Sequence, residues 1–274
     1  MIFYFSATGN TLWAAQKISQ ATGESLIEIT PQADTSYTLG PDERIGFCFP
    51  VHGWRPPSIV RRFVSNLHIS GAEGHYTFAL CSAGDTIGET LDIFARDLAQ
   101  STGIKLNAKA SIIMPESYIG LPFMDVDTPD NEQRKINRAA ERLTSIAEDI
   151  KQRRAIGEKL DIGHWPRINS RVIGAAFVGF IITDKPFHVE ADRCLKCGKC
   201  ATVCPVDDII GGKGCMPEWK HNGLCMSCFK CYHHCPTHAI EYGNRTRHKG
   251  QYYFGRRKPN TLSPDDNTKT TENK

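Results

Sequence analysis

The stretch CLKCGKCATVCP, residues 194–205, decides the architecture of the second half of this 274-residue chain. Thirty-one positions later, residues 225–236 repeat its spacing as CMSCFKCYHHCP. In each copy an isoleucine, Ile209 or Ile240, follows at the same offset. So many matches at one fixed offset indicate a duplicated structural unit.

Both runs follow the pattern C-x2-C-x2-C-x3-C-P. Three cysteines spaced by two residues can surround one corner of an iron–sulfur cubane, whereas zinc needs only two closely spaced pairs. The fourth cysteine of each run lies further along and is turned by the proline, so it ligates the cluster of the other run. We predict two [4Fe–4S] clusters, with zinc or a degraded site as the alternative. The predicted ligand sets are Cys194, Cys197, Cys200 and Cys235 for one cluster, and Cys225, Cys228, Cys231 and Cys204 for the other.

The composition, 40% apolar and 23% charged residues, is typical of a soluble globular protein. The N-terminal region has no secretory signal pattern, and the most apolar internal stretch, residues 172–182, is shorter than the roughly 20 residues of a membrane span. We therefore expect a cytoplasmic protein with no transmembrane segment and with reduced thiols. Residues 172–182 are interpreted as a core or interdomain segment, with a membrane-surface contact as the alternative.

The charge is uneven, with a net charge of −5 over residues 1–128 and +8 over residues 129–274. Two oxidised clusters with their thiolates carry about −2 each, which offsets about half of the positive excess. No nucleic-acid recognition motif accompanies the basic half. We therefore expect no nucleic-acid partner.

The first half alternates short apolar runs with amphipathic stretches. Five strands are predicted at residues 1–5, 25–29, 44–49, 75–81 and 110–114, and helices at residues 11–21, 57–67, 87–99 and 129–155. This order predicts an α/β fold with a doubly wound five-stranded parallel sheet, followed by a small α+β domain that carries the cysteines. The predicted organisation is an α/β domain at 1–157, a connector without sustained periodicity at 158–186, the two-cluster domain at 187–245 and an extension at 246–274 whose end, from Pro259, is disordered.

A polar loop follows the first predicted strand and precedes the first predicted helix. Its hydroxyls, its glycine and the free amides of the helix N-terminus make an anion cradle, although a capped strand–turn–helix junction is the alternative. The loop lacks the lysine of a P-loop and the GxGxxG of a dinucleotide site, so we expect it to hold a monophosphate. The residues are Ser6, Ala7, Thr8, Gly9, Asn10 and Thr11.

The string SATGNT, residues 6–11, resembles the phosphate loop of flavodoxins, which bind FMN. Two more loops follow the third and fourth predicted strands, where flavodoxins place their ring-binding segments. In the first, His52 and Trp54 offer flat faces for stacking; helix capping by His52 and surface packing of Trp54 are the alternatives. In the second, small residues approach the pyrimidine side of the ring, or Asp85 or Thr86 caps a helix. The predicted contacts are Pro50, Val51, His52, Gly53 and Trp54, and then Ser82, Ala83, Gly84 and Asp85.

Residues 190–245 resemble a bacterial-type two-cluster ferredoxin. Together with PVHGW at 50–54 and MPESY at 114–118, the two halves resemble fused flavodoxin–ferredoxin proteins of anaerobic bacteria and archaea. The resemblance implies a flavodoxin-like first domain, bound FMN, and electron transfer between FMN, two [4Fe–4S] clusters and redox partner proteins. No chemistry is predicted for MPESY.

Two other functions remain open. One is an FMN-dependent reductase of a small molecule, fed by its own ferredoxin domain, with His52 or Tyr118 as proton donor. The other is a two-cluster ferredoxin whose first domain has lost flavin and serves for docking. Of the remaining cysteines, Cys48 and Cys81 are expected to be buried, and Cys215 is interpreted as a small structural thiol, with a redox or alternative ligand role as the other hypothesis.

Overall fold

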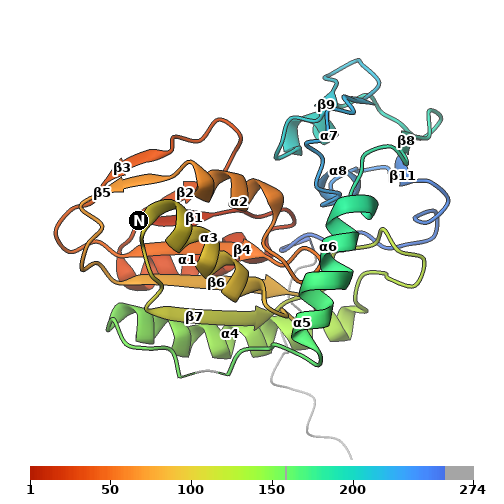
Figure 1. The fold of residues 1–274 in the computed structure, drawn as a ribbon. Coiled ribbons are helices and arrows are strands. Elements are labelled where there is room, and N and C mark those ends of the chain that lie inside the picture. Colours follow the sequence, from red (N-terminus) through yellow and green to blue (C-terminus); the bar gives the residue numbers. More distant parts are fainter. Residues whose placement is uncertain (158, 257–274) are drawn as a thin grey trace, which may run out of the picture.

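The computed structural model describes residues 1–157 and 159–256, and its first half is built on a five-stranded parallel sheet (Figure 1). The strands are β1 (Ile2–Tyr4), β2 (Leu26–Glu28), β4 (Ile45–Pro50), β6 (Thr77–Ala83) and β7 (Ala108–Ile113). Their spatial order, β2-β1-β4-β6-β7, is the flavodoxin-like order. The predicted doubly wound parallel sheet is therefore confirmed.

Helices cover both faces of this sheet, which explains why its central strands are apolar without alternation. Helices α1 (Asn10–Thr22) and α4 (Pro129–Lys151) lie on one face, and α2 (Ser58–Ser65) and α3 (Thr90–Thr102) on the other. Along β4, Phe47 and Phe49 pack toward α2 and α3, whereas Cys48 packs toward α1 and α4. Both Cys48 and Cys81 are buried, as predicted.

The helix boundaries differ from the prediction where distant segments bind the backbone. Helix α3 starts three residues later than predicted, because the amides of Ile87 and Gly88 donate to the carbonyls of Asp161 and Ile162. A parallel pair of short strands, β3 (Ser36–Thr38) and β5 (His68–Ser70), was not predicted. Three-residue strands at an exposed edge leave no readable periodicity.

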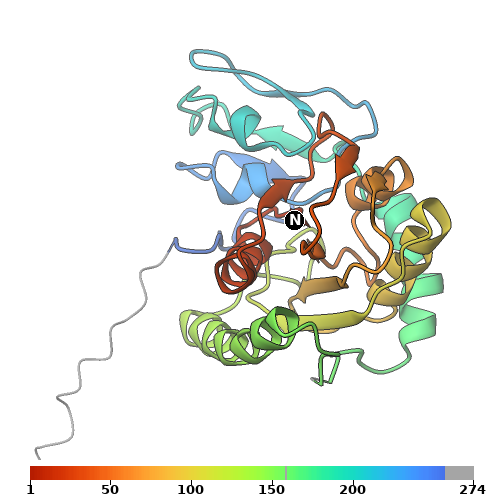
Figure 2. The same ribbon diagram turned by 90° about the vertical axis from the view of Figure 1, so that its left-hand side faces the viewer.

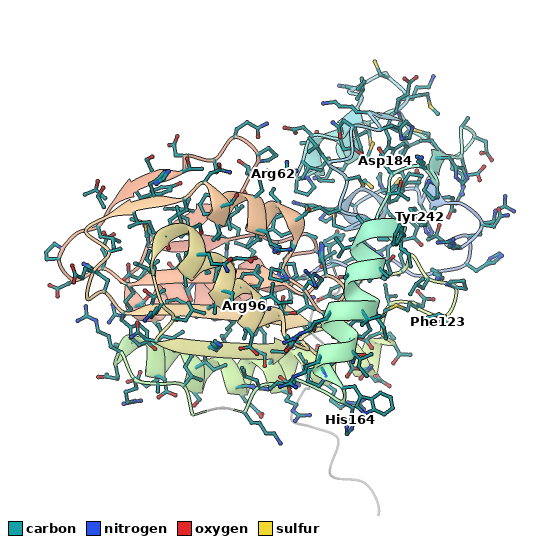
Figure 3. All side chains as sticks on the ribbon, in the orientation of Figure 1. Arg62, Arg96, Phe123, His164, Asp184 and Tyr242 are labelled. Atoms are coloured by element: carbon teal, nitrogen blue, oxygen red, sulfur yellow. The ribbon has the colours of Figure 1, made fainter. Side chains whose placement is uncertain are left out.

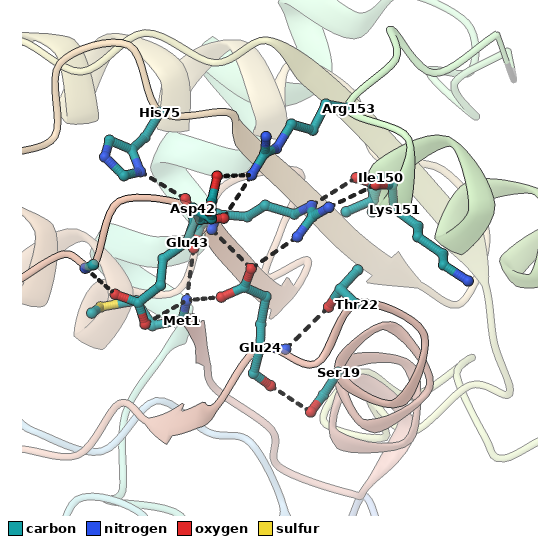
Figure 4. Close-up of polar contacts among 12 residues, drawn as sticks. Met1, Ser19, Thr22, Glu24, Asp42, Glu43, His75, Ile150, Lys151 and Arg153 are labelled. Carbon is teal, nitrogen blue, oxygen red and sulfur yellow. Dashed lines mark hydrogen bonds and ion pairs between the residues drawn. The ribbon is translucent and has the colours of Figure 1, made fainter.

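A polar network fastens the end of the sheet that faces away from the predicted cofactor loops (Figure 4). Arg44, just before β4, pairs with Glu24 at 3.1 Å. The same guanidinium donates to the carbonyls of Ile150 and Lys151 at the end of α4. Because these residues lie at the amino ends of the strands, the network stabilises the fold and leaves the carboxyl ends free.

Residues 166–181 form one nearly continuous helix, where the sequence predicts an irregular connector. Its turns are α5 (Pro166–Ile168), η1 (Asn169–Ile173), α6 (Gly174–Ala176) and η2 (Phe177–Ile181). Figure 1 shows this helix standing between the α/β domain and the cysteine-rich part. Gly174 allows the helix to lie against the 50–54 loop, since a Cβ there would fall 2.1 Å from the carbonyl oxygen of Gly53. A tertiary contact thus sustains a helix that has no amphipathic period.

The cysteine-rich part, drawn in cyan and blue at the top of Figure 2, consists of two copies of one unit whose strands pair with each other. The first contains β8 (Phe187–Val189), α7 (Lys199–Val203) and β9 (Ile209–Ile210), and the second contains β10 (Glu218–Trp219), α8 (Lys230–His233) and β11 (Ile240–Tyr242). Strand β8 pairs antiparallel with β11, and β10 with β9. Each copy therefore completes its hairpin with a strand from the other, which is the duplication expected from the sequence.

The chain after β11 returns to the α/β domain. The amide of Phe254 donates to the carbonyl of Thr8 at 2.7 Å, and its ring packs on Trp13 with centroids 5.2 Å apart. The hydroxyl of Tyr252 donates to Asn10 at 2.5 Å. The first part of the extension is thus an ordered clamp over the 6–11 loop; the end of the chain, for which we predict disorder, lies outside the described residues.

Candidate redox centres

The three predicted flavin loops meet at one cavity of about 860 Å³ at the carboxyl edge of the sheet. Every residue predicted for the flavin site lines this cavity except Gly9. Parallel strands end at the same edge of the sheet, so loops that are distant in sequence converge there. The volume lies within the range of about 300–1,000 Å³ that is typical of small-molecule sites.

Some polar groups of the 6–11 loop make hydrogen bonds within the protein, and one is available to the cavity. Thr11 shares a hydrogen bond with Ser82 (Oγ1 to Oγ, 2.7 Å), and Asn10 donates to the carbonyl of Pro115 at 3.1 Å. The Ser6 hydroxyl accepts from the amide of Gly9 at 3.2 Å, and Gly9 has a left-handed φ of 94°. Among the described residues, the buried Thr8 hydroxyl has no hydrogen-bond partner, so it is available to a ligand. The loop geometry fits a phosphate held by neutral donors beside a helix N-terminus.

Trp54 and His52 occupy the wall formed by the second loop. The indole Nε1 of Trp54 donates to Thr86 at 2.9 Å, which joins the second and third loops and fixes the plane of the ring. Burial lowers the pKa of His52 to about 4, so its imidazole is neutral at pH 7. Neutral, flat side chains of this kind suit stacking better than proton donation.

Much of the cavity wall comes from residues that the sequence analysis did not assign to a site. The helix 166–181 contributes Val172, Ile173 and Phe177, and the segment after β7 contributes Glu116 and Tyr118. At the mouth, Phe123 (Figure 3) and Phe180 are 83% and 87% exposed. Only the MPESY motif signalled part of this wall in the sequence, because the helix residues reach the cavity through tertiary packing.

The first predicted ligand set comes together on one side of the cysteine-rich part. Cys194, Cys197, Cys200 and Cys235 line one small cavity. Burial raises the pKa of Cys200, and the nearby Cys235 and Cys197 raise it further. Cys215 lines the same cavity and is exposed, whereas a structural thiol would be packed in a core.

The second predicted set is grouped in the same way. Burial raises the pKa of Cys231 well above its ordinary value, and Cys228, Cys225 and Cys204 raise it further through their proximity. Thus the fourth cysteine of the first run lies with the second run, as predicted from the motif. Among the described residues, no three Cys, His, Asp or Glu side chains are grouped closely enough to hold a single metal ion.

Backbone strain in the two runs directs amides at the sulfurs. Lys196 and Ser227, which occupy equivalent positions, have left-handed φ angles of 52° and 47°. Their amides donate to the Sγ atoms of Cys194 and Cys225, each at 3.4 Å. Non-glycine residues adopt this conformation at a cost and are concentrated at functional sites.

The fourth cysteines receive a second pair of equivalent bonds. The amide of Asp208 donates to Cys204 Sγ at 3.3 Å, and the amide of Ala239 donates to Cys235 Sγ at 3.2 Å. Amide donors stabilise thiolate sulfur and are one of the means by which proteins tune cluster potentials. Two cysteines in each set receive these amide bonds, and a set of four cysteines fits a four-iron cluster.

The two candidate sites meet at the second run. The large cavity is lined by residues of the 6–11 loop and also by Met226, Ser227 and Cys228. From α8, buried His233 reaches the segment 115–118: its Nε2 lies 2.7 Å from the carbonyl oxygen of Ser117, and its Nδ1 accepts from the amide of Tyr252 at 3.2 Å. Because Nδ1 is the acceptor, Nε2 carries the proton and donates to Ser117. The cysteine-rich part is therefore anchored directly beside the cavity.

Comparison with known proteins supports the iron–sulfur interpretation. A family model of the 4Fe-4S binding domain matches residues 186–210, which cover the first of the two repeats. None of the curated proteins matches the chain significantly. In the part of the chain that the structure describes, no helix has the length and apolar character needed to span a membrane. The chain thus contains a 4Fe-4S binding domain of the ferredoxin type.

Proposed function

We propose that the protein relays electrons between a bound FMN and two [4Fe–4S] clusters, and between these centres and redox partner proteins. The observation that carries the proposal is the shared cavity, which is lined both by Ser6 and Thr8 and by Cys228. FMN accepts two electrons and releases them singly, whereas each cluster passes one. A cavity lined by both candidate sites supports direct exchange between them.

In this proposal each part of the chain has a defined task. The 6–11 loop binds the phosphate, and Trp54 orients the ring system. The helix 166–181 covers the cavity with apolar side chains and limits the access of water. The cysteines of the second set hold the cluster next to the flavin, and those of the first set hold the cluster toward the partner. The paired amide–sulfur bonds adjust the potentials of both clusters.

The decisive experiment is the cofactor content of protein purified without oxygen. We expect one FMN per chain and about eight irons, as two four-iron clusters require. Iron without flavin would reject the flavin relay and leave a two-cluster ferredoxin with a docking domain. Flavin with about four irons would reject the second cluster.

The phosphate assignment has its own test in Thr8→Val. A hydrogen bond to a charged group contributes about 1.5–3 kcal/mol, so this variant should bind FMN roughly 10- to 100-fold more weakly. Thr11→Val is the matched control, because the Thr11 hydroxyl already pairs with Ser82. Equal affinities for Thr8→Val and wild type in a flavin-fluorescence titration would contradict the assignment.

A reductase acting on a small molecule is the second candidate. It is favoured by the exposed aromatic side chains Phe123 and Phe180 at the cavity mouth, which suit an apolar substrate. Reoxidation of the reduced protein by one class of small molecule, without carrier proteins, would support a reductase. Exchange with several carrier proteins and with no small molecule would support the relay.

A further inference from the structure

Glu116 places a carboxyl group in the wall of the large cavity. Its Oε1 accepts two backbone hydrogen bonds, from Ser117 at 2.9 Å and from Tyr118 at 2.8 Å. Among the described residues, Oε2 has no hydrogen-bond donor. It lies against Gly84, where an added Cβ would fall only 2.2 Å from it. The carboxyl is thus held from behind, and its second oxygen lies against the third flavin loop.

The charged groups around Glu116 are committed to each other. Lys135 from α4 donates to Asp127 at 2.7 Å and to the carbonyl of Gly84 at 2.9 Å. Asp127 also accepts the backbone amide of Glu116 at 2.8 Å. Burial raises the pKa of Glu116 above its ordinary value; the two amides and Lys135 oppose this rise, and Asp127 adds to it. Glu116 therefore keeps its proton to a higher pH than an exposed glutamate does.

Two other titratable groups on the cavity wall, His52 and Tyr118, are poorly suited to exchange a proton near neutrality. His52 is already neutral, because its pKa lies near 4. Burial raises the pKa of Tyr118 far above its ordinary value. Asp85, the other carboxyl on the wall, is exposed to solvent. Glu116 is the remaining acid, and it is partly buried.

We propose that Glu116 is the proton donor and acceptor that accompanies electron transfer in this cavity. The proposal rests on the proposed function. With FMN bound, the carboxyl of Glu116 would release one proton for each electron that arrives from the Cys228 side, so that together they supply the equivalent of one hydrogen atom. The carboxylate then takes a proton from water. In the reverse direction, Glu116 would first release its proton to water, and its carboxylate would then take the proton that leaves the site with the electron.

The test compares Glu116→Gln with wild type and with Glu141→Gln as the matched control, because Glu141 is an exposed glutamate of α4 that does not line the cavity. Glutamine keeps the shape and both backbone bonds but carries no exchangeable acid proton. Infrared difference spectra between oxidised and reduced protein should contain a carboxylic-acid band in wild type and Glu141→Gln, and that band should be absent in Glu116→Gln. Flavin reduction in stopped flow should slow roughly 100-fold in Glu116→Gln, within the range of general acid catalysis.

The pH dependence of the rate of flavin reduction gives a further test, because the proposal predicts its direction. In wild type the rate should fall as the pH rises through the pKa of Glu116, because the donor is lost; in Glu116→Gln this dependence should disappear. An unchanged infrared band or an unchanged rate, with normal flavin content, would overturn the proposal. Loss of flavin in Glu116→Gln with retention in Glu116→Asp would assign the residue to binding and also overturn it. Wild-type protein without flavin would instead refute the proposed function itself.

Discussion

The two cysteine repeats have the same local structure and different surroundings. Equivalent residues adopt the same left-handed turns and donate equivalent amide bonds to sulfur. Yet Cys197 of the first repeat is exposed, whereas its counterpart Cys228 lines the large cavity beside the predicted flavin loops. Local geometry thus makes two similar groups of cysteines, and the packing of each repeat gives them different surroundings. We infer that the second cluster exchanges electrons with the flavin and the first with a partner.

The strongest test of this difference compares Cys228→Ala with Cys197→Ala. Each variant should lose about four of about eight irons, because each cluster loses one ligand. Only Cys228→Ala should abolish exchange between flavin and cluster, since it removes the centre next to the cavity. Iron analysis and stopped-flow spectroscopy measure both effects. If Cys197→Ala stops the flavin exchange equally, the assigned order of the centres is wrong.

A second comparison uses Phe229 and Gly198, which are equivalent positions with φ angles of 56° and 74°. Phe229 is buried among Phe187, Tyr232 and Tyr242, so Phe229→Ala should lower the free energy of unfolding by about 3–5 kcal/mol. Gly198→Ala places a Cβ 2.8 Å from the backbone of Gly212 and should cost about 1–3 kcal/mol. Denaturant midpoints of the cofactor-loaded protein measure both. A larger loss in Gly198→Ala would show that the core is not centred on the second repeat.

A smaller loss of stability is expected when the clamp over the 6–11 loop is weakened. Tyr252→Phe removes the hydroxyl that donates to Asn10 and should cost about 1–2 kcal/mol, because the buried amide oxygen loses its donor. FMN should also dissociate faster. Tyr253→Phe is the control, since that ring stacks on His234 and its hydroxyl has no hydrogen-bond partner among the described residues. Equal effects of the two variants would argue against a specific clamp.

The smallest effects are expected at the strained turns. Lys196→Gly relieves about 1–2 kcal/mol of left-handed strain but gives the unfolded chain about 0.5–1 kcal/mol of extra freedom, so stability should change by less than about 1 kcal/mol. Ser227→Gly also loses two hydrogen bonds between the serine hydroxyl and the backbone of Thr183. It should therefore be the less stable of the two in thermal unfolding. The opposite order would show that the second turn gains no stability from its hydrogen bonds with Thr183.

Those features of the protein that rest on local patterns could be predicted from the sequence. The cysteine spacing predicted the duplicated unit and the exchange of the fourth cysteine between the two groups. Alternating apolar runs predicted the five strands, and the loops that follow those strands predicted which residues would meet at the edge of the sheet. Local patterns did not predict the start of helix α3 or the small strands β3 and β5, because these depend on contacts with segments that are distant in the chain.

Much of the cavity wall could not be predicted in this way. The sequence of residues 166–181 shows no sustained apolar period, and the close approach of this helix to the 50–54 loop at Gly174 is a tertiary contact. His52 and Tyr118 were the candidate proton donors by residue type, but burial moves their pKa values away from neutrality. Glu116 was assigned no chemistry, because its role depends on its contact with Gly84 and on the distant Lys135.

By itself the sequence determined the parallel sheet, the duplicated cysteine unit and the grouping of its cysteines, because strand periodicity and cysteine spacing act over short stretches of chain. Only the tertiary structure decided that Cys228 and Thr8 share one cavity and that residues 252–254 close over the 6–11 loop. These contacts join segments that are far apart in the chain. Their formation depends on side-chain packing and on the exclusion of water, which no local pattern records.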